Sequence, residues 1–358
     1  MKGKLARILL MLLLAVGVVI YGYSWKLSQP KFDERLETNP LAASQIAPIE
    51  EALTFARLSS GEVLLVLSSD IDGVTAIDLS DTEYFTGVDG IDAYQTLGRD
   101  QLLRLTESLS SQQFSWQSLS TPLSVQSKIV AAGTNFKAHA EEVSHTGDPF
   151  LFPKLSTITP WNAAVTAGAR LDHEVEICAV SLEDYPQAEV AHSRKVTLGY
   201  LLCGDYTDRW LLVKEIDLDA EMGTTGFAAG KGGATRLPVG PFLVIPQSHE
   251  FYKKIDMKLY VNNELRQSSN AGLMNWNPWT IMSKALEKCD ANYLNGEGVV
   301  KLLDNCERIP AKTLVLTGTP EGVMFSPLTL WSSGFYLKSG DLVTSQASYL
   351  GVLSNTID

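Results

Sequence analysis

Residues 171–180 alternate in polarity as a β-strand does, and this stretch restricts most strongly what the chain can form. One face of the strand carries Glu174 and Glu176. The other face carries apolar side chains and a histidine: Leu171, His173, Val175, Ile177 and Ala179. Carboxylates at positions i and i+2 project the same way, with backbones roughly 6.5–7 Å apart. They repel, and each raises the pKa of the other unless a cation lies between them. A solvated strand face would also explain such a pair, so other residues must decide.

A third carboxylate follows a second apolar strand candidate, residues 196–203. Asp205 lies just beyond the end of that strand, where a loop can direct it back toward a site. Two glutamates and one aspartate form an all-oxygen ligand set that suits Mg²⁺ or Mn²⁺, with Ca²⁺ as a further candidate. Zn²⁺ suits the set poorly because no Cys or His is spaced to join it. The predicted metal ligands are therefore Glu174, Glu176 and Asp205.

Eight short blocks follow one another between about residues 128 and 357. They are 133–142, 149–154, 174–176, 204–209, 230–231 with 238–241, 261–267, 317–323 and 339–341. In this order they resemble the fumarylacetoacetate hydrolase family. The resemblance implies an α+β fold that is mainly β, with a C-terminal domain of rolled mixed β-sheets. It also implies assembly as a homodimer.

His139 and Glu142 are three residues apart and share a face if residues 136–143 form a helix. A carboxylate beside an imidazole orients it and raises its basicity, as a general base requires. A surface helix pair has the same spacing. The family resemblance implies that this segment is a lid whose His–Glu pair activates water or moves a proton, so both residues are predicted to be catalytic. The segment 135–149 is expected to be mobile without ligand.

Lys231 lies in a Gly-Lys-Gly-Gly sequence that is not a phosphate-binding loop. Such a loop requires glycine at position 225 and Ser or Thr at position 232, which are Thr225 and Gly232 here. The resemblance implies a catalytic lysine that binds a substrate carboxylate or polarises a carbonyl. Many relatives follow this lysine with an aromatic residue and an aspartate, where this chain has Gly233 and Ala234.

The resemblance also implies four substrate-binding residues: Lys154, Arg209, Gln267 and Thr319. Each has a structural alternative. Arg209 could pair with Asp208, Gln267 could close a hairpin, and the turn at Thr319 could simply end a strand.

The N-terminus is basic at Lys2, Lys4 and Arg7, and residues 8–23 carry no charge. Residues 5–25 are long enough to span a bilayer. A cleaved signal peptide is the rival interpretation, but Tyr21, Tyr23 and Trp25 are typical of a membrane interface rather than of a cleavage site. Residues 1–28 are therefore predicted to be a single-pass anchor in a lipid bilayer. The leading basic residues favour a cytoplasmic N-terminus and a catalytic domain on the other, non-cytoplasmic side, the periplasm in a bacterium.

The remaining chain divides into a linker at 29–50, a small N-terminal domain at 51–125 and a catalytic domain at 126–358. In the small domain, residues 53–57 and 63–67 predict a hairpin, 74–79 a strand and 94–109 a helix. In the catalytic domain the patterns predict strands at 129–132, 196–203, 242–245, 257–261, 314–317 and 342–347, and helices at 136–143, 211–218 and 280–288.

The chain of 358 residues has a formal net charge of −12, and its basic residues do not cluster beyond the N-terminus. A nucleic-acid partner is therefore not expected. The four cysteines at 178, 203, 289 and 306 show no metal-ligand spacing. Cys178 and Cys203 are expected to be buried thiols, although a disulfide remains open.

The predicted metal ligands together with the family resemblance imply a metal-dependent hydrolase or lyase that acts on C–C bonds of small 2-oxo or 1,3-dicarbonyl acids. A decarboxylase, hydratase or isomerase would use the same residues. An interpretation of a different class is a membrane-tethered binding module without turnover.

Overall fold

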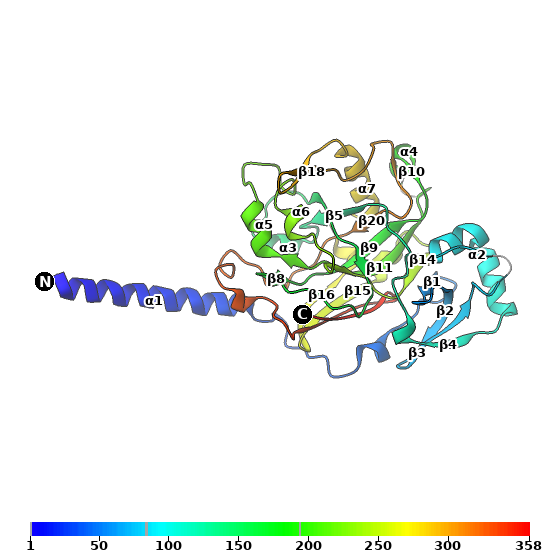
Figure 1. Ribbon diagram of the computed structural model, residues 1–358, viewed down its shortest axis with the longest axis horizontal. Coiled ribbons are helices and arrows are strands. Elements are labelled where there is room, and N and C mark those ends of the chain that lie inside the picture. The colour runs from blue at the N-terminus through cyan, green and yellow to red at the C-terminus, as the bar shows by residue number, and fades with distance from the viewer. Residues whose placement is uncertain (1, 83–84, 193–194) are drawn as a thin grey trace.

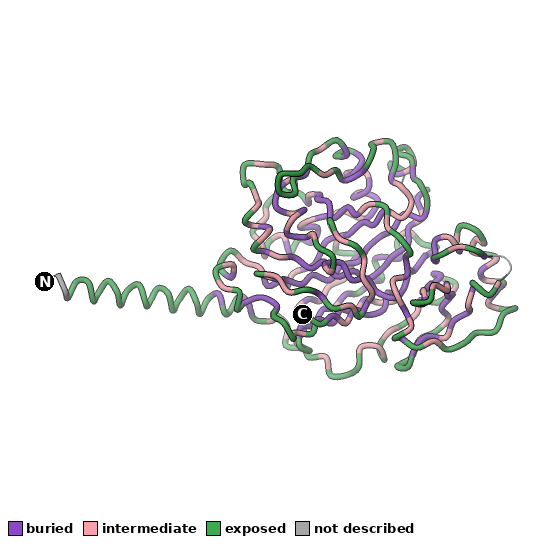
Figure 2. Tube along the Cα trace, in the orientation of Figure 1, coloured by how far each residue is buried: buried purple, intermediate pink, exposed green. Residues whose placement is uncertain are grey.

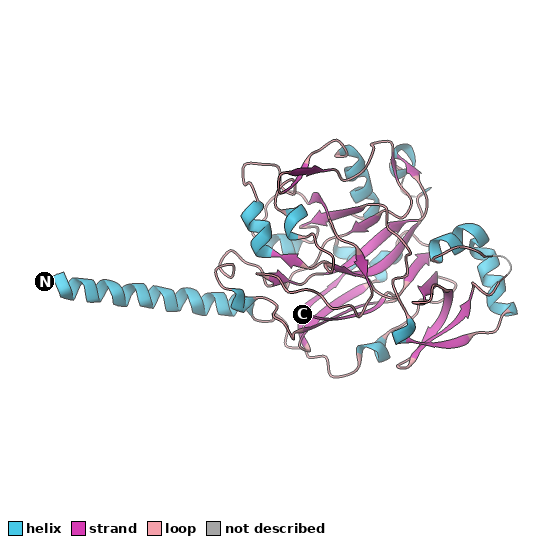
Figure 3. Ribbon diagram, viewed as in Figure 1, coloured by secondary structure: helices cyan, strands magenta, loops and turns pink. Residues whose placement is uncertain are grey.

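The computed structural model describes residues 2–82, 85–192 and 195–358, so Met1 of the predicted anchor lies outside it. Strands dominate the fold, and a long N-terminal helix projects away from them (Figures 1 and 3). The α+β, mainly β fold class is confirmed.

The helix α1 (Lys2–Ser28) is long and apolar enough to cross a membrane. Its apolar side chains are exposed along most of its length, as Figure 2 shows by the green tube. Within the described residues, its contacts with the rest of the chain lie toward its C-terminal end, where Tyr21 packs against Trp331 and Phe335 and where Ser24 and Ser28 are buried. A helix with so much exposed apolar surface requires a covering that the described part of the chain does not provide.

The main sheet has the strand order β4-β3-β2-β1-β14-β11-β9-β20-β5-β6 within the described residues. Its strands are β1 (Ala52–Arg57), β2 (Val63–Ser69), β3 (Gly73–Asp78), β4 (Gln112–Ser115), β5 (Ile129–Gly133), β6 (Phe150–Pro153), β9 (Val175–Ser181), β11 (Leu198–Gly204), β14 (Leu243–Pro246) and β20 (Leu314–Leu316). Neighbours are antiparallel except β20 and β5, which are parallel.

A second, antiparallel sheet has the order β16-β15-β21-β22. Its strands are β15 (Asp256–Val261), β16 (Glu264–Asn270), β21 (Leu342–Ala347) and β22 (Gly351–Thr356). The apolar face of β9, with Val175 and Ile177, shares one core with Leu259 and Leu353 of this sheet. The central strand is therefore buried on one face by sheet packing, and its other face is available to carry Glu176.

Short elements connect the two sheets. Paired short strands are β7 (Ile158–Thr159) with β13 (Leu237–Pro238), β8 (Leu171–Asp172) with β12 (Thr207–Asp208), β10 (Tyr185–Pro186) with β19 (Arg308–Ile309), and β17 (Tyr293–Asn295) with β18 (Gly298–Val300). The further α-helices are α2 (Gly90–Ser108), α3 (Lys137–Glu142), α4 (Gln187–Val190), α5 (Arg209–Glu215), α6 (Phe227–Gly230) and α7 (Pro278–Glu287). The 3₁₀ turns are η1 (Pro40–Ala43), η2 (Trp116–Ser118), η4 (Phe251–Lys254), η5 (Ala271–Leu273) and η6 (Ser333–Phe335).

The predicted small domain forms its hairpin and helix, but its strands are not a separate sheet. β1 pairs with β14, so the hairpin extends the main sheet. The carboxylate of Asp89 caps α2 through the backbone N–H groups of Ile91 and Asp92 and accepts a hydrogen bond at 2.8 Å from Lys312, which lies just before β20. The boundaries at 51 and 125 remain predictions, but the region is joined to the rest through both backbone and side chains.

The expectation of free, buried thiols was wrong. Cys178 of β9 and Cys203 of β11 form a disulfide with a Cα–Cα distance of 5.9 Å, and Cys289 and Cys306 form a second one at 5.4 Å. Spacing along the chain could not reveal the first bond, because it depends on the register in which Cys178 lies opposite Leu201. Diagonal neighbours on antiparallel strands are close enough to join.

Candidate active site

The strands β9 and β11 bring the three predicted carboxylates together. Glu174 lies in the break between β8 and β9, and Glu176 lies in β9 opposite Cys203. Asp205 follows β11 and donates its backbone N–H to the carbonyl of Glu174 at 3.0 Å. All three are buried, and one oxygen from each lies within 4.8 Å of the others. Glu174, Glu176 and Asp205 are called the carboxylate cluster below.

Two lysines enter the carboxylate cluster. The ammonium of Lys231 lies 2.6 Å from Asp205 Oδ2 and 2.5 Å from Glu174 Oε2. The ammonium of Lys154 lies 2.5 Å from Asp205 Oδ1 and donates to the carbonyl of Lys231 at 2.8 Å. Lys231 lines the cavity described below. Lys154 is fully buried behind Asp205, so it supports the cluster instead of reaching the cavity.

Arg209 is held by a carboxylate that the sequence interpretation missed, Asp172. Arg209 Nε donates to Asp172 Oδ2 at 2.8 Å, and Nη2 donates to Glu174 Oε1 at 2.5 Å. Asp172 also accepts backbone N–H groups of Met324 and Phe325.

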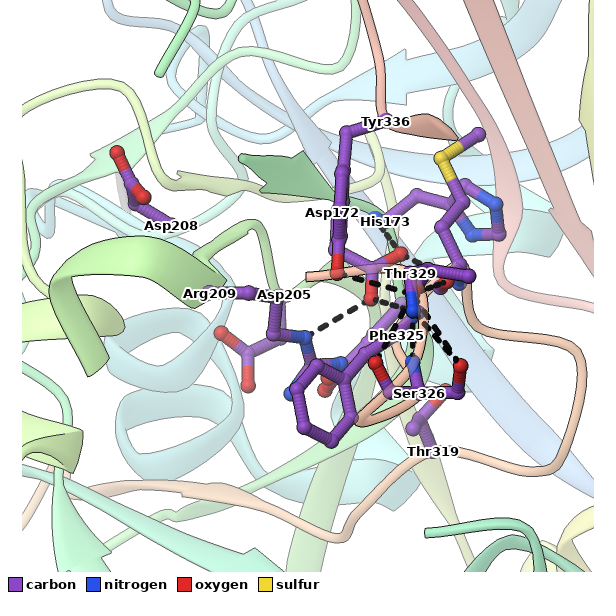
Figure 4. A network of polar contacts seen from close by, with 12 residues as sticks. Asp172, His173, Asp205, Asp208, Arg209, Thr319, Phe325, Ser326, Thr329 and Tyr336 are labelled. Atoms are coloured by element: carbon purple, nitrogen blue, oxygen red, sulfur yellow. Dashed lines mark hydrogen bonds and ion pairs between the residues drawn. The ribbon is translucent and has the colours of Figure 1, made fainter. Parts of the chain in front are cut away.

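Figure 4 shows this network, with Asp208 lying apart from it. Asp208 caps α5 through the N–H groups of Trp210 and Leu211. The suggested Arg209–Asp208 pair is therefore wrong, and Arg209 joins the cavity wall to the cluster.

The charges of this cluster and its neighbours do not balance. Four buried carboxylates (Asp172, Glu174, Glu176 and Asp205) face three cations (Lys154, Arg209 and Lys231). Burial would raise the pKa of Asp205, but the Lys154 and Lys231 ammonium groups outweigh it and hold this pKa below its usual value. Burial and then the Asp205 charge raise the pKa of Glu176 well above its usual value. With all carboxylates ionised, these seven residues therefore lack one positive charge. The raised pKa of Glu176 identifies it as the carboxylate that is not compensated.

His139 and Glu142 lie together on α3, as their spacing predicts. His139 Nδ1 lies 3.3 Å from Glu142 Oε2. The Glu142 carboxylate also accepts the backbone N–H of Gly322, at 3.1 Å, and pairs at 2.5 Å with Lys31 of the linker. Burial would raise the pKa of Glu142, but His139 and Lys31 outweigh it and lower the pKa. The Glu142 carboxylate is thus held from two sides, by Lys31 and by the backbone N–H of Gly322. His139 and Glu142 are called the dyad below.

Gln267 and Thr319 form one unit. The fully buried Gln267 accepts the backbone N–H of Val175 at 2.9 Å and donates to Thr319 Oγ1 and to the Pro320 carbonyl, both at 2.8 Å. The Thr319 hydroxyl donates to the Val175 carbonyl at 3.0 Å. Thr319 lines the cavity and Gln267 does not, so Gln267 positions Thr319 against β9.

One cavity of about 460 Å³ connects these groups. Six predicted site residues line it: His139, Glu174, Glu176, Arg209, Lys231 and Thr319. Most of the remaining lining is apolar and comes from β5, β6, α5, the loop after α5, α6 and the 325–327 segment. Sequence interpretation missed this wall because its residues are ordinary core types, and nothing in their spacing distinguishes a cavity from a packed interior.

The sequence matches the family model described as fumarylacetoacetate (FAA) hydrolase C-terminal over residues 128–358. This match covers more than half of the chain. The chain belongs to the fumarylacetoacetate hydrolase family.

Characterised members of the fumarylacetoacetate hydrolase family resemble the chain at moderate identity. The 2,4-didehydro-3-deoxy-L-rhamnonate hydrolase of Sphingomonas sp. (strain SKA58) is 28% identical over 230 residues, which is 63% of this chain and 70% of that protein. The oxaloacetate tautomerase YisK of Bacillus subtilis (strain 168) is 26% identical over 253 residues, 67% of this chain and 72% of that protein.

Solved structures share the fold at lower identity. Maleylpyruvate hydrolase from Sphingobium sp. SYK-6, in complex with manganese(II) and pyruvate, has a TM-score of 0.57 at 18% identity, covering 85% of this chain and 98% of that one. The 2-hydroxyhepta-2,4-diene-1,7-dioate isomerase from Mycobacterium marinum has a TM-score of 0.55 at 18% identity, covering 86% and 98%. A hydrolase and an isomerase thus share this fold, and a hydrolase and a tautomerase are similar to the chain in sequence.

Proposed function

We propose that this chain is a metal-dependent hydrolase that cleaves a C–C bond in small acylpyruvate-like acids. One observation carries the proposal: Glu174 and Glu176, from a buried carboxylate cluster that is short of one positive charge, line the same cavity as His139 of the His–Glu dyad. A binding module has no need for an acid–base pair beside such a cluster.

A divalent cation fits the cluster because its donors are three carboxylates, the hard oxygen ligands that Mg²⁺ and Mn²⁺ prefer. Ca²⁺ would accept the same donors. Glu174, Glu176 and Asp205 would hold the ion. When bound, it would act as a Lewis acid that polarises oxygen atoms of the substrate. The manganese and pyruvate in the maleylpyruvate hydrolase structure support this choice.

The dyad would supply the base. Glu142 faces His139 Nδ1, which leaves Nε2 to take a proton from water. The hydroxyl of that water adds to the acyl carbonyl carbon, and the bond from this carbon to the methylene carbon breaks. The methylene carbon keeps the electron pair and receives the proton. The products are a carboxylic acid and a 2-oxo acid of the pyruvate type.

The other lining groups would hold the substrate. Lys231 and Arg209 place positive charge at the inner end of the cavity, where a substrate carboxylate would lie. The Thr319 hydroxyl is fixed by Gln267 beside the same end. Lys154 would keep Asp205 ionised and oriented instead of contacting substrate.

The full chain should release pyruvate from acetylpyruvate in the presence of Mn²⁺ or Mg²⁺ and lose this activity with a chelator. Oxaloacetate is the informative second substrate, because a family relative is an oxaloacetate tautomerase. The three reactions differ in product. Hydrolysis of acetylpyruvate yields an acid and pyruvate, and decarboxylation of oxaloacetate yields carbon dioxide and pyruvate. Tautomerisation of oxaloacetate changes only the keto–enol absorbance. Absence of all three reactions with either metal would favour a non-catalytic binding module.

We also propose that α1 anchors the chain in a bilayer with residues 29–358 in an oxidising, non-cytoplasmic compartment. Its exposed apolar length and the two disulfides support this arrangement, because disulfides persist mainly outside the cytosol. A reporter fused after Asp358 tests it, and cytoplasmic-type reporter activity would overturn the orientation. Homodimer formation stays a prediction, which light scattering of the solubilised chain can check.

A further inference from the structure

The cavity has a charged end and an apolar end. The charged end holds the carboxylate cluster with Arg209 and Lys231. From there an aromatic wall leads outward: the Lys231 ammonium lies 5.6 Å from the centre of the Phe152 ring, and the ring centres of Phe152 and Phe227 are 5.1 Å apart. Phe227 in turn packs edge-on against Phe150 at 4.9 Å.

A second part of the wall comes from α5, which packs against α6, and from the loop that follows α5. Leu212, Val213 and Ile216 line the cavity, and the wall continues to Leu218 and Met222. Exposure increases along this path, from 6% at Leu212 to 83% at Leu218. The mouth of the cavity is therefore rimmed by aliphatic side chains that extend into solvent, an arrangement that costs free energy unless something apolar covers it.

The outer cavity has little to attract a second substrate carboxylate. Among the described lining residues, the lysine and arginine side chains are Lys231 and Arg209, and both are ion-paired at the cluster. His145, the remaining titratable group toward the mouth, bonds through Nε2 to the Asp148 carbonyl at 3.0 Å and packs against Phe150. A dicarboxylic acid would have to bury its distal charge without a partner, which is unfavourable.

The cavity wall is also adjacent to the contact with α1. Phe325 and Pro327 line the cavity, and the next residue, Leu328, accepts a hydrogen bond from Ser24 at 2.8 Å. Trp331 donates to the same serine at 3.2 Å. In Figure 1, α3 and α5 lie on the side of the domain from which α1 projects. If α1 spans a bilayer, the side of the domain that carries α5 faces the bilayer surface.

We infer that this site takes an amphiphilic substrate: a 2-oxo or 1,3-dicarbonyl acid whose far end is a linear aliphatic chain, reached from the bilayer surface. The acid group would lie at the charged end, and the chain would run along the aromatic wall and leave the cavity between Leu218 and Met222. This inference rests on the proposed function for the reacting end and adds the identity of the other end.

The test compares acylpyruvates that differ only in the tail, using the full chain in lipid nanodiscs with Mn²⁺. Acetyl-, hexanoyl- and decanoylpyruvate lengthen the alkyl chain, and succinylpyruvate ends in a second carboxylate. We expect kcat/KM to rise two- to fourfold per methylene, since each buried methylene contributes about 0.8 kcal/mol. Succinylpyruvate should be the poorest of the larger substrates. Equal rates for acetyl- and decanoylpyruvate, or a preference for succinylpyruvate, would overturn the inference.

A binding measurement separates this inference from the proposed reaction. Calorimetry with pyruvate, 2-oxooctanoate and 2-oxoglutarate reports on the tail even if no acylpyruvate is hydrolysed. Tighter binding of 2-oxooctanoate than of both others supports the amphiphilic ligand, and then absent turnover would count against the hydrolase alone. Tighter binding of 2-oxoglutarate, or equal binding of all three, would overturn the tail assignment whatever the turnover.

Substitutions locate the effect. Leu218→Lys changes a side chain that is 83% exposed, so it should fold, and it places a cation at the rim. It should lower the decanoyl-to-acetyl ratio of kcat/KM about tenfold and raise the relative rate with succinylpyruvate. Ile71→Lys is the matched control, because Ile71 is also exposed but lies in the β2–β3 turn. If the decanoyl-to-acetyl ratio of kcat/KM fell equally in both variants, the chain-length effect would come from partition of the substrate into the nanodisc. That result would overturn the inference.

Discussion

The carboxylate cluster and the dyad meet at one cavity, which Glu174, Glu176 and His139 line, but they are built differently. The cluster is carried by β9 and the end of β11, in the middle of the main sheet, and its ion pairs measure 2.5–2.6 Å. The dyad lies on the six-residue helix α3, which has no side-chain N-cap, and its contact measures 3.3 Å. In the proposed mechanism, the residues that would hold the metal therefore lie on the rigid sheet, and the residues that would move a proton lie on a short helix.

The strongest test removes a cluster residue. Asp205→Ala should abolish turnover and also the rise in melting temperature that Mn²⁺ causes by binding the folded state. The substitution leaves Lys154 and Lys231 without this partner, so Asp205→Asn, which keeps the shape, is the control for folding. An Asp205→Ala protein that still shows the full metal-induced rise would exclude Asp205 as a ligand.

The second test removes the base. His139→Ala should lower kcat by about 10²–10⁴-fold, the usual contribution of one acid–base group. Mn²⁺ affinity should stay nearly constant, since the cluster is intact. Glu142→Gln should act similarly because the imidazole loses its charged partner. Steady-state kinetics and metal titration of both variants decide this: near-normal turnover would remove the dyad from the mechanism, and lost metal binding would make His139 a ligand.

The third test compares local stability. Amide hydrogens of α3 and the 143–149 segment should exchange at least about tenfold faster than those of β9, because a short uncapped helix opens more easily than a central strand. A bound 2-oxo acid should slow exchange in the helix and leave β9 unchanged. Equal protection of both elements without ligand would argue against a moving lid.

The smallest expected effect concerns the linker. Lys31 lowers the pKa of Glu142, so Lys31→Ala should raise that pKa. Glu142 would then lose its charge at a higher pH, and the acid limb of the kcat/KM profile would move upward. The shift should be below about one pH unit because Lys31 is half exposed and its charge is screened. Lys137→Ala is the control, since Lys137 pairs with Glu141 on the same helix. If the acid limb of the kcat/KM profile did not move in Lys31→Ala, Lys31 would have only a structural role.

Sequence patterns succeeded where residue type and alternation determine the outcome. The prediction that Glu174, Glu176 and Asp205 lie together is confirmed, although the predicted strand over residues 171–180 is broken between β8 and β9 and Glu174 lies in that break. The helix around His139 was predicted over 136–143 and observed over Lys137–Glu142. These features depend on local geometry, which a sequence contains.

Sequence patterns did not reveal how deeply a side chain is buried or which residue distant in sequence it pairs with. Lys154 and Gln267 are predicted to bind substrate, a role that stays a prediction, but both are buried and neither lines the cavity. Asp172 and Lys31 were overlooked because their partners, Arg209 and Glu142, are distant in sequence. The distance of a side chain from the cavity surface depends on how the whole sheet packs, and no short motif records it.

The disulfide between Cys178 and Cys203 has a practical consequence for work with this protein. Cys178 lies two residues after Glu176 and Cys203 two residues before Asp205, so the bond joins the two strands directly beside the proposed metal ligands. Protein made in a reducing cytosol would have all three carboxylates of the cluster but would lack this disulfide. Batches of identical sequence could then differ in metal content according to how they were oxidised, and a purified sample should be assayed for thiols before it is judged inactive.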